Sequence, residues 1–292
     1  MIETSKAFAE TKPAPPRSVI TDDNYSFLQK HVYNASGIVL DASKLYLIES
    51  RLTPIVRIER LQSLNELCQQ VRQNSSSLLA RRVVEAMTTN ETLFFRDLAI
   101  FDALRKTVIP RILQAKAAGR KLSIWSAAAS TGQEAFSLGM MLNEMGIRPG
   151  EVEILATDLS EQVLERARKG RFLQIEVNRG LPSSYLLKYF RQNGLEWEID
   201  ASIRNMVSFR SMDLRQSMRG MGPFDIVLCR NVLIYFDVDT KKAILDQIRG
   251  ALAPGGTLVL GCAETIINLH DGFATETIGG AIVYFSKNSS GI

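Results

Sequence analysis

Charged and polar side chains follow several short apolar runs of this sequence, at the places where strands would end. Asp158 follows the run 152–157, Asp213 closes a short segment, and Asn231 comes soon after the run 224–229. In an open α/β sheet, ligands bind beyond the carboxyl ends of the strands, near the point where strand order reverses. We therefore expect these side chains to meet at one edge of a sheet and to form a ligand site.

The first of these strand ends is a stretch of small residues, 126–134, that leads into Glu134. Small side chains let a ligand approach the backbone, and a helix that begins there offers free N–H groups. The stretch has a single glycine, Gly132, so it is not the GxGxxG motif of dinucleotide sites. Taken alone, the segment fits a tight strand-to-helix turn without a ligand equally well.

Asp158 suits a nucleoside ligand, because a carboxylate at this place commonly accepts hydrogen bonds from ribose hydroxyls. Ser160 is a good helix N-cap, and the alternative is that Asp158 belongs only to that cap. At the fourth strand end, Arg230 and Asn231 are followed by four large apolar residues. That mixture indicates a binding wall rather than a plain turn.

The segment 87–97 combines three threonines and an asparagine with a phenylalanine pair and an arginine. Thr89 or Asn90 is a suitable N-cap for a helix here. Phe94 and Phe95 need burial, so we expect them in a core between two domains. The polar residues of the segment are also expected to contact the ligand.

The chain of 292 residues is long enough for two modest domains. Residues 1–20 contain three prolines and no periodic apolar pattern, which predicts a disordered tail. Helical spacing of apolar residues predicts a small helical domain over 21–87, followed by a linker at 88–105. Over 106–287, short apolar runs alternate with amphipathic helices, which predicts an α/β domain with a mostly parallel sheet. A final hairpin is expected to include 281–285.

Composition excludes several classes of protein. Hydrophobic residues make up 46% and charged residues 23% of the chain, which is ordinary globular usage. No stretch approaches the roughly 18 to 20 apolar residues of a membrane span, and the N-terminus lacks the apolar core of a secretory signal, so we expect a cytoplasmic protein. Three cysteines without CxxC spacing indicate neither a disulfide framework nor a thiolate zinc site. The net charge of +4 fits an acidic partner.

Together these segments resemble the CheR family of chemoreceptor glutamate methyltransferases, which use S-adenosylmethionine. The matching motifs are TTNETLFFRD at 88–97, WSAAASTGQE at 125–134, ATDLS at 156–160, KGRF at 169–172, FDIVLCRNVLIYFD at 224–237, and LAPGG at 252–256 leading to GCAE at 261–264. The resemblance implies a Rossmann-like class I methyltransferase sheet, with an N-terminal helical receptor-recognition domain. It also implies a small antiparallel β-subdomain inserted at about 187–213.

The resemblance assigns roles to single residues. Arg96 and Tyr235 would face the transferred methyl group and act in catalysis. Glu134 and Asp158 would hold the amino portion and the ribose or adenine portion of S-adenosylmethionine. The product would be S-adenosylhomocysteine, and no metal is expected. The expected cofactor contacts are Asn90, Thr92, Arg96, Glu134, Asp158, Asp213, Leu214, Asn231 and Val232.

The implied substrate explains why the sequence has so few candidate bases. A glutamate side chain has an ordinary pKa of about 4.3 and is ionised at neutral pH, so the transfer needs no general base. The two histidines, His31 and His270, stand beside no candidate site. Arg96 is suited to hold the substrate carboxylate through a forked hydrogen bond.

The implied partners are the acidic cytoplasmic methylation helices of chemoreceptors. Basic residues of the helical domain would face these helices, with an ordinary solvated face as the alternative. These residues are Lys44, Arg51, Arg57 and Arg60. We expect a monomer that binds no nucleic acid and does not insert into the membrane.

Some family members also tether to a receptor's C-terminal pentapeptide, which adds as a strand to the small antiparallel subdomain. In this chain Asn193 and Gly194 are a strong signal for a tight turn, so the loop is too short to hold a peptide. We therefore expect an enzyme that works without the tether.

Three other functions fit the sequence less well. A nucleic-acid methyltransferase commonly carries a D/N-P-P-Y/F motif where this chain has RNVL at 230–233, and basic stretches interleaved with aromatic residues are absent. A non-catalytic docking module that binds S-adenosylmethionine predicts damage at Arg96 or Tyr235, and both are intact. The lone Gly132 disfavours a nicotinamide dehydrogenase.

Overall fold

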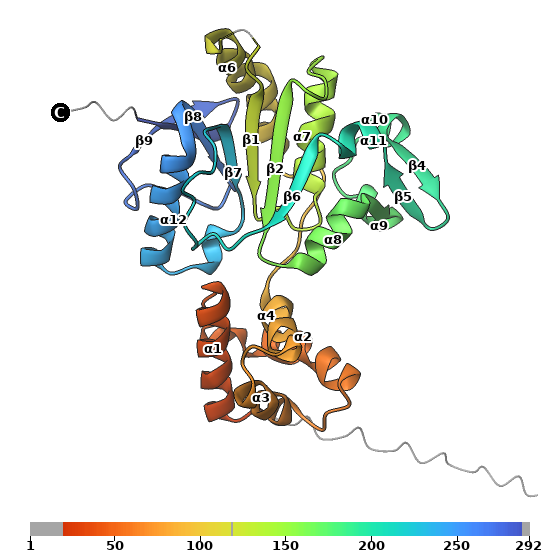
Figure 1. The fold of residues 1–292 in the computed structure, drawn as a ribbon, viewed down its shortest axis with the longest axis vertical. Helices are drawn as coiled ribbons and strands as arrows, with labels where there is room; N and C mark the ends of the chain where they lie inside the picture. Colours follow the sequence, from red (N-terminus) through yellow and green to blue (C-terminus); the bar gives the residue numbers. More distant parts are fainter. Residues whose placement is uncertain (1–19, 118, 288–292) are drawn as a thin grey trace, which may run out of the picture.

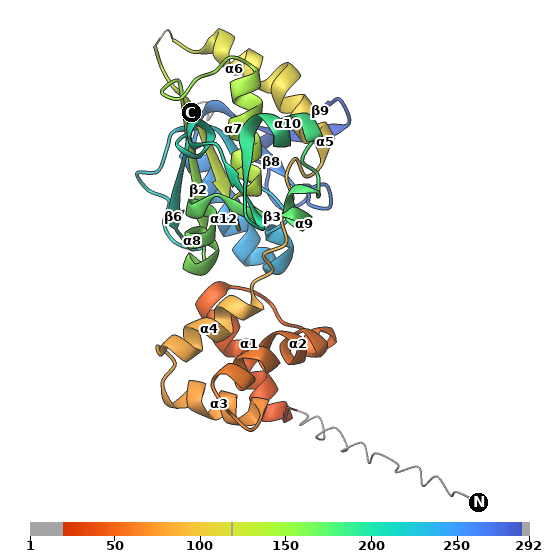
Figure 2. The ribbon, with the colours of Figure 1, turned by 90° about the vertical axis from the view of Figure 1, so that its right-hand side faces the viewer.

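The computed structural model describes residues 20–117 and 119–287, which form a helical domain and an α/β domain (Figures 1 and 2). The helical domain lies beyond one end of the sheet, and a single segment after α4 connects the two domains. Most of the tail predicted at 1–20 lies outside the described residues. Ile20, which the prediction placed in that tail, is buried in the core of the helical domain.

The helical domain packs four α-helices around one apolar core. Its elements are α1 (Asp22–Ser36), the 3-10 turn η1 (Ala42–Lys44), α2 (Leu45–Ile58), α3 (Leu64–Gln73) and α4 (Leu78–Met87). The Thr21 hydroxyl accepts the Asn24 N–H at the start of α1, and Gly37 ends this helix at φ +76°, a left-handed conformation that favours glycine. No helix in the described part of the chain is long and apolar enough to cross a membrane.

The α/β domain begins with three consecutive helical segments, α5 (Leu98–Ala103), η2 (Leu104–Val108) and α6 (Ile109–Ala115). Strands and helices then alternate. In chain order they are β1 (Leu122–Ala127), α7 (Gln133–Glu144), β2 (Val152–Asp158), α8 (Glu161–Lys169), β3 (Arg171–Leu173), α9 (Gln174–Val177), α10 (Ser183–Tyr189), β4 (Phe190–Asn193), β5 (Glu196–Ile199), α11 (Ala201–Arg204), β6 (Val207–Ser211), β7 (Phe224–Cys229), η3 (Leu233–Tyr235), α12 (Val238–Ala251), β8 (Leu252–Leu260), β9 (Phe273–Ile278) and β10 (Ala281–Ser286).

The main sheet has seven strands in the order β6-β2-β1-β7-β8-β10-β9. Strands β6, β2, β1, β7 and β8 pair in parallel, while β10 runs antiparallel to both β8 and β9. The final hairpin is thus confirmed. From β1 the chain builds outward on one side through β2 and β6 and then on the other through β7 and β8. The strand order therefore reverses beside β1, where α/β sheets bind ligands.

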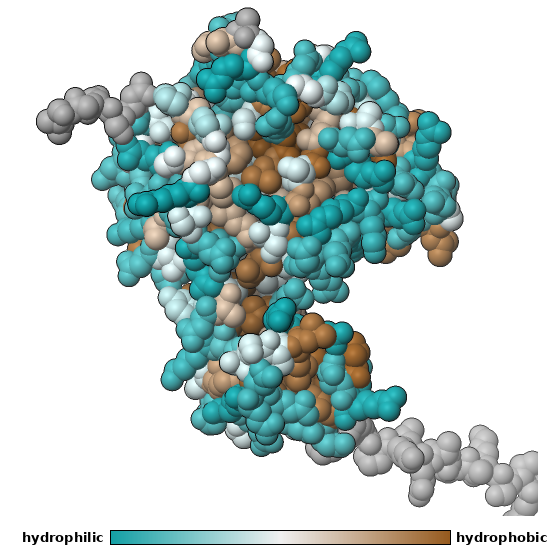
Figure 3. Space-filling model, in the orientation of Figure 1, coloured by the Kyte–Doolittle hydropathy of each residue, from teal (hydrophilic) through white to brown (hydrophobic). Residues whose placement is uncertain are grey.

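The central strands are buried on both faces, which is why they appear in the sequence as nearly continuous apolar runs. In β7, Ile226 and Leu228 join the core shared with α7 and the α5–α6 segment, whereas Val227 and Cys229 join the core shared with α12. This alternation is the two-residue period of a strand. Figure 3 shows that the surface is largely hydrophilic, with apolar side chains gathered over parts of each domain.

The small antiparallel sheet differs from the predicted range 187–213. Its strand order is β3-β5-β4, so it includes β3 at Arg171–Leu173, well before residue 187. Strand β6 instead extends the main sheet by pairing in parallel with β2. Strand β3 is only three residues long and so gives almost no periodic signal in the sequence. Strand β6 is a partly exposed edge strand, so its apolar pattern does not show which sheet it joins.

Candidate active site

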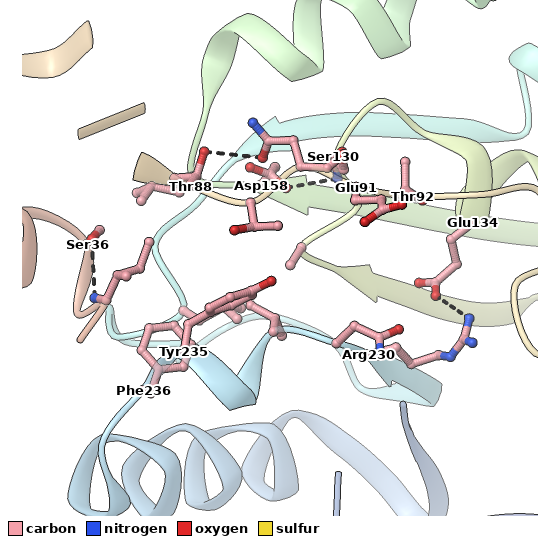
Figure 4. Close-up of a pocket in the computed structure, with 18 of the residues that line it drawn as sticks. Ser36, Thr88, Glu91, Thr92, Ser130, Glu134, Asp158, Arg230, Tyr235 and Phe236 are labelled. Atoms are coloured by element: carbon pink, nitrogen blue, oxygen red, sulfur yellow. Dashed lines mark hydrogen bonds and ion pairs between the residues drawn. The ribbon is translucent and has the colours of Figure 1, made fainter. Parts of the chain in front are cut away.

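A pocket lies between the carboxyl ends of β1, β2 and β7, the segment after α4 and the end of α1 (Figure 4). Its open volume is about 910 Å³, part of which is continuous with solvent. The structure brings together at this pocket all the residues that the sequence predicted for cofactor binding and catalysis. They are Asn90, Thr92, Arg96, Glu134, Asp158, Asp213, Leu214, Asn231, Val232 and Tyr235. Their individual roles toward a ligand remain predictions.

Glu134 lies in the first turn of α7, where the helix dipole favours a negative charge. Its two oxygens have different partners: the Ser126 hydroxyl donates to Oε1 at 2.7 Å, and Arg230 Nη1 donates to Oε2 at 2.8 Å. The side chain is only 12% exposed. This network fixes the carboxylate at the end of β1 and at the wall of the pocket.

Asp158 terminates β2 as a buried carboxylate. Its Oδ2 accepts the Ser130 N–H at 2.8 Å and its Oδ1 accepts the Ser160 N–H at 3.0 Å. Burial raises the pKa of this carboxyl above its ordinary value, and the N–H groups of Ser160 and Ser130 act against that increase. A carboxylate oxygen has two acceptor sites, so each oxygen keeps capacity for a ligand hydroxyl. Asp158 thus stabilises the turn into α8, which Ser160 caps, while it also lines the pocket.

The segment between α4 and α5 is irregular, which corrects the prediction of a helix capped by Thr89 or Asn90. Helix α5 starts only at Leu98, after Asp97. Tertiary hydrogen bonds hold the segment in place of a cap: Arg51 donates to the Thr89 hydroxyl at 3.0 Å, and the Ser130 hydroxyl donates to the Asn90 carbonyl at 2.8 Å. These bonds override the local capping preference of Thr and Asn.

Phe94 and Phe95 anchor this segment, but in the core of the α/β domain rather than between the two domains. Phe94 packs edge-on against Phe172, at 5.0 Å between ring centroids, and Phe95 packs against Tyr185 at 5.1 Å. Gly180 permits close packing here, since a Cβ on it would lie 2.1 Å from the Phe94 carbonyl oxygen. The aromatic pair therefore fixes one wall of the pocket to the sheet.

Arg230, which the sequence places in a binding wall without a particular role, lines the pocket. Its side chain is 2% exposed, and besides Glu134 it contacts the Asp97 carboxylate and the Arg96 carbonyl, both at 2.7 Å from Nη2. Its Nε is buried and, within the described residues, has no hydrogen-bond partner. An arginine that directly follows a buried strand needs carboxylate partners. This requirement could have predicted from the sequence that Arg230 pairs with acidic residues such as Glu134 and Asp97.

Arg96 and Tyr235 both line the pocket, Arg96 from the segment after α4 and Tyr235 from η3. Arg96 Nη1 donates to the Glu91 carbonyl at 3.3 Å, and the side chain is only partly buried. Tyr235 lies on η3, and its carbonyl accepts the Val39 N–H at 2.9 Å from the helical domain. Its hydroxyl points into the pocket in Figure 4.

Asp213 links the pocket to the helical domain. Arg215 donates to both of its oxygens, with Nη2 2.6 Å from Oδ2, and also donates through Nη1 to the Tyr33 and Asn34 carbonyls near the end of α1. The C-terminal end of a helix carries partial negative charge, so a cation is favourable there. Part of the hydrogen-bonding capacity of Asp213 is therefore used by Arg215.

The four basic residues predicted to meet a partner differ in availability. Arg57 and Arg60 are exposed. Lys44 donates to the Val39 carbonyl at 2.9 Å and pairs with Asp41, and Arg51 is bound to the segment after α4. The structure thus places Arg51 as a brace between the domains rather than on an open surface.

Neither histidine lines the pocket. His31 lies in the helical domain near the Ala80 carbonyl, and His270 pairs with Asp246 on α12. Across residues 20–117 and 119–287, no three His, Cys, Asp or Glu side chains are arranged to hold a metal ion. The ionisable side chains that line the pocket are carboxylates, arginines and a tyrosine.

Comparison with known proteins identifies relatives over almost the whole chain. Residues 90–279 match the family described as CheR methyltransferase, SAM binding domain, and residues 23–88 match CheR methyltransferase, all-alpha domain. The chain is 41% identical over 267 residues to chemotaxis protein methyltransferase 1 of Pseudomonas aeruginosa, covering 89% of this chain and 95% of that protein. It is 38% identical over 273 residues to a chemotaxis protein methyltransferase of Vibrio parahaemolyticus, covering 92% and 98%. Among solved structures, it is similar to a TehB-like SAM-dependent methyltransferase from Corynebacterium glutamicum, with a TM-score of 0.38, 14% identity, and coverage of 75% and 100%.

Proposed function

Because the chain belongs to the CheR family of S-adenosylmethionine-dependent protein-glutamate methyltransferases, we propose that its interdomain pocket transfers methyl groups to the methylation helices of chemoreceptors. The observation that supports this most is a pair of carboxylates at the pocket: Glu134 in the first turn of α7, which follows β1, and Asp158 at the end of the neighbouring strand β2. One carboxylate suits an amino group and the other suits ribose hydroxyls.

The residues present fit S-adenosylmethionine. Glu134 would hold its amino group and Asp158 its ribose hydroxyls, each from the direction in which the side chain is already fixed by hydrogen bonds. The Arg230 side chain also lines the pocket, and the ion pair that it forms with Glu134 keeps that carboxylate in place. Asn90, Thr92, Leu214 and Val232 would line the remaining contact surface.

The mechanism requires alignment rather than proton transfer. When bound, S-adenosylmethionine supplies a methyl group on a positively charged sulfur. Arg96 would hold the substrate carboxylate through paired N–H bonds, and the Tyr235 hydroxyl would contribute a neutral donor that leaves the carboxylate nucleophilic. The segment anchored by Phe94 and Phe95 would keep Arg96 at the pocket and help to exclude water.

Receptor recognition is assigned to the helical domain and to the active site itself. Arg57 and Arg60 offer exposed positive charge on and just after α2, together with the exposed apolar side chain of Ile58. This combination suits an acidic amphipathic helix. The chain would act on it as a monomer.

We also propose that the enzyme does not need a pentapeptide tether. The loop between β4 and β5 has two residues, because Asn193 pairs with Glu196. Gly194 takes φ +62° there, which is typical of a tight hairpin. Such a turn leaves no extended loop to seat a peptide. Calorimetry should detect no binding of a free receptor C-terminal pentapeptide, and a micromolar Kd abolished by changes between Arg191 and Arg204 would overturn the proposal.

The proposed activity is tested by incubating the full chain with radiolabelled S-adenosylmethionine and receptor-containing membranes. We expect label on the receptor that is released by mild base, because a glutamate methyl ester hydrolyses under those conditions. Replacing the methylated glutamates of the receptor by alanine should remove the label. Base-stable label, or label on nucleic acid, would contradict the proposal.

A further inference from the structure

Glu264, after the end of β8, gathers four backbone N–H groups although it does not line the pocket. Its Oε2 accepts the N–H groups of Asn231 and Gly261 at 2.6 and 2.9 Å. Its Oε1 accepts those of Val232 and Ile234 at 3.0 and 3.3 Å. Four N–H bonds match the whole acceptor capacity of a carboxylate. Every acceptor site of this side chain is therefore occupied by a backbone N–H group.

Three of these donors belong to the loop that leads from β7 to η3. Asn231 has φ +58°, a left-handed conformation that is uncommon for any residue but glycine. In this conformation, the successive N–H groups of the loop converge on one point instead of pairing with a neighbouring strand. The carboxylate of Glu264 occupies that point and accepts the N–H groups of the partly buried Asn231 and Val232 and of the exposed Ile234.

The fourth donor, Gly261, shows how closely the two strand ends approach. A Cβ on Gly261 would lie 2.5 Å from Asn231 Nδ2 and 2.9 Å from Glu264 Oε2, so a side chain at this position would displace both of these side chains. Strands β7 and β8 pair in parallel up to Cys229 and Leu260. After Cys229 and Leu260 the strand pairing ends. The Glu264 carboxylate then holds the two segments together by accepting N–H groups from both.

We propose that Glu264 is a positioning residue for methyl transfer, which sets the backbone from which Asn231, Val232 and Tyr235 reach the pocket. This proposal rests on the function proposed above. The Tyr235 hydroxyl points into the pocket from the end of the loop that Glu264 holds, so a shift of the loop backbone moves that hydroxyl. Glu264 touches neither substrate nor cofactor and acts only through this loop.

Two substitutions separate positioning from general stability. Glu264→Gln keeps the shape of the side chain but turns an NH2 group toward two backbone N–H donors, so those two bonds cannot form. Glu264→Ala removes the carboxylate and leaves four N–H groups around a space that formate or acetate can occupy. Glu276→Gln is the matched control, since Glu276 forms an exposed ion pair with Arg111, far from the loop.

The rate of a single turnover is measured with the full chain, saturating S-adenosylmethionine and receptor membranes, below the thermal transition of each variant. We expect Glu264→Gln to lower the rate about 100-fold, as for a reacting group displaced by about 1 Å, with an unchanged circular dichroism spectrum. Formate should restore the rate of Glu264→Ala in a saturable way, while chloride at equal ionic strength should not. Formate should not restore Glu264→Gln, and the control should match the parent protein.

Several outcomes would overturn the proposal. The first is that both variants fold and react within twofold of the parent rate, and the second is that the loss of rate only follows the unfolded fraction. The third is that neither variant folds. The fourth is that formate has no effect on a folded Glu264→Ala. Calorimetry with S-adenosylhomocysteine provides a readout that does not need the receptor. If the parent protein fails to label receptors, the proposed function is wrong, whereas variants that keep both the parent's rate and its affinity for S-adenosylhomocysteine count against Glu264 alone.

Discussion

Arg230 and Glu134 form a buried ion pair of 2.8 Å that joins the end of β7 to the first turn of α7. The same guanidinium reaches Asp97 at 2.7 Å, so one cation holds two carboxylates from separate segments of the chain. Sheet, helix and the segment that carries Arg96 are thereby fixed to each other at the pocket. Removing the cation would leave two poorly solvated carboxylates facing one another.

We expect Arg230→Ala to lower the free energy of unfolding by about 3–5 kcal/mol, the range for losing one partner of a buried pair. Arg230→Lys should recover only part of this loss, because an ammonium group lacks the fork that contacts Glu134 and Asp97 together. Urea unfolding followed by circular dichroism gives the values. Arg111→Ala, which breaks an exposed pair with Glu276, is the control and should change stability by about 0–1 kcal/mol. Equal losses in the two alanine variants would contradict the role given to Arg230.

Asp158 gives a pH dependence whose sign follows from its raised pKa. The folded protein holds the proton of this carboxyl more tightly than the unfolded chain does. Its contribution to stability is therefore fully present below the unfolded pKa of about 3.9 and is lost as pH rises through the higher folded value. Asp158→Asn cannot ionise. As pH rises over that interval, the parent should therefore lose stability that the variant keeps. The unfolding free energy of the variant minus that of the parent should become more positive.

Urea unfolding of both proteins at a series of pH values checks this expectation. A difference that stays constant with pH, or that moves in favour of the parent as pH rises, would show that burial does not raise this pKa. The same variant should bind S-adenosylhomocysteine more weakly by about 1–3 kcal/mol, the range for a hydrogen bond to a charged group. Asp239→Asn, in the exposed first turn of α12, is a control for the loss of a charge.

Part of this site follows from the sequence, because its signals are local. Asp158 and Asn231 stand where buried apolar runs end, and parallel strands bring such ends to one edge of a sheet. Thr89 was wrong as a cap because its hydroxyl accepts a hydrogen bond from Arg51, 38 residues away in the chain. The sequence gives Glu264 no role of its own, since its partners are backbone N–H groups, which every residue except proline has. The apolar periodicity of a sequence predicts helices and strands but not the contacts between residues that lie far apart along the chain.

Arg96 is expected to affect methyl transfer more than cofactor binding. Arg96→Ala should lower the turnover rate by at least about 100-fold if it removes the paired hydrogen bonds that orient the carboxylate. The affinity for S-adenosylhomocysteine, measured by calorimetry, should change far less. Arg96→Lys should restore only part of the rate, because a point charge lacks paired geometry. Equal losses of rate and affinity would instead assign Arg96 to the cofactor alone.

Arg51 and Arg57 lie six residues apart in the same helix, yet they should behave differently when replaced by alanine. Arg51 donates to the Met87 and Thr88 carbonyls at 3.0 and 3.1 Å, as well as to Thr89, so its loss frees the segment that carries the pocket wall. We expect Arg51→Ala to weaken S-adenosylhomocysteine binding and to increase hydrogen exchange across residues 88–97. Arg57 is exposed, and Arg57→Ala should leave both quantities unchanged while it raises the KM for receptor membranes.

The increase in KM caused by Arg57→Ala should shrink as salt is raised, because the attraction between exposed charges is screened beyond about 10 Å at 0.1 M salt. The effect of Arg51→Ala on S-adenosylhomocysteine binding should persist in salt, because that side chain acts through short hydrogen bonds to backbone carbonyls. Calorimetry and methylation kinetics at low and high salt therefore separate the two arginines. If both variants show the same salt-dependent increase in KM and intact cofactor binding, Arg51 is a receptor contact like Arg57, and the segment after α4 does not depend on it.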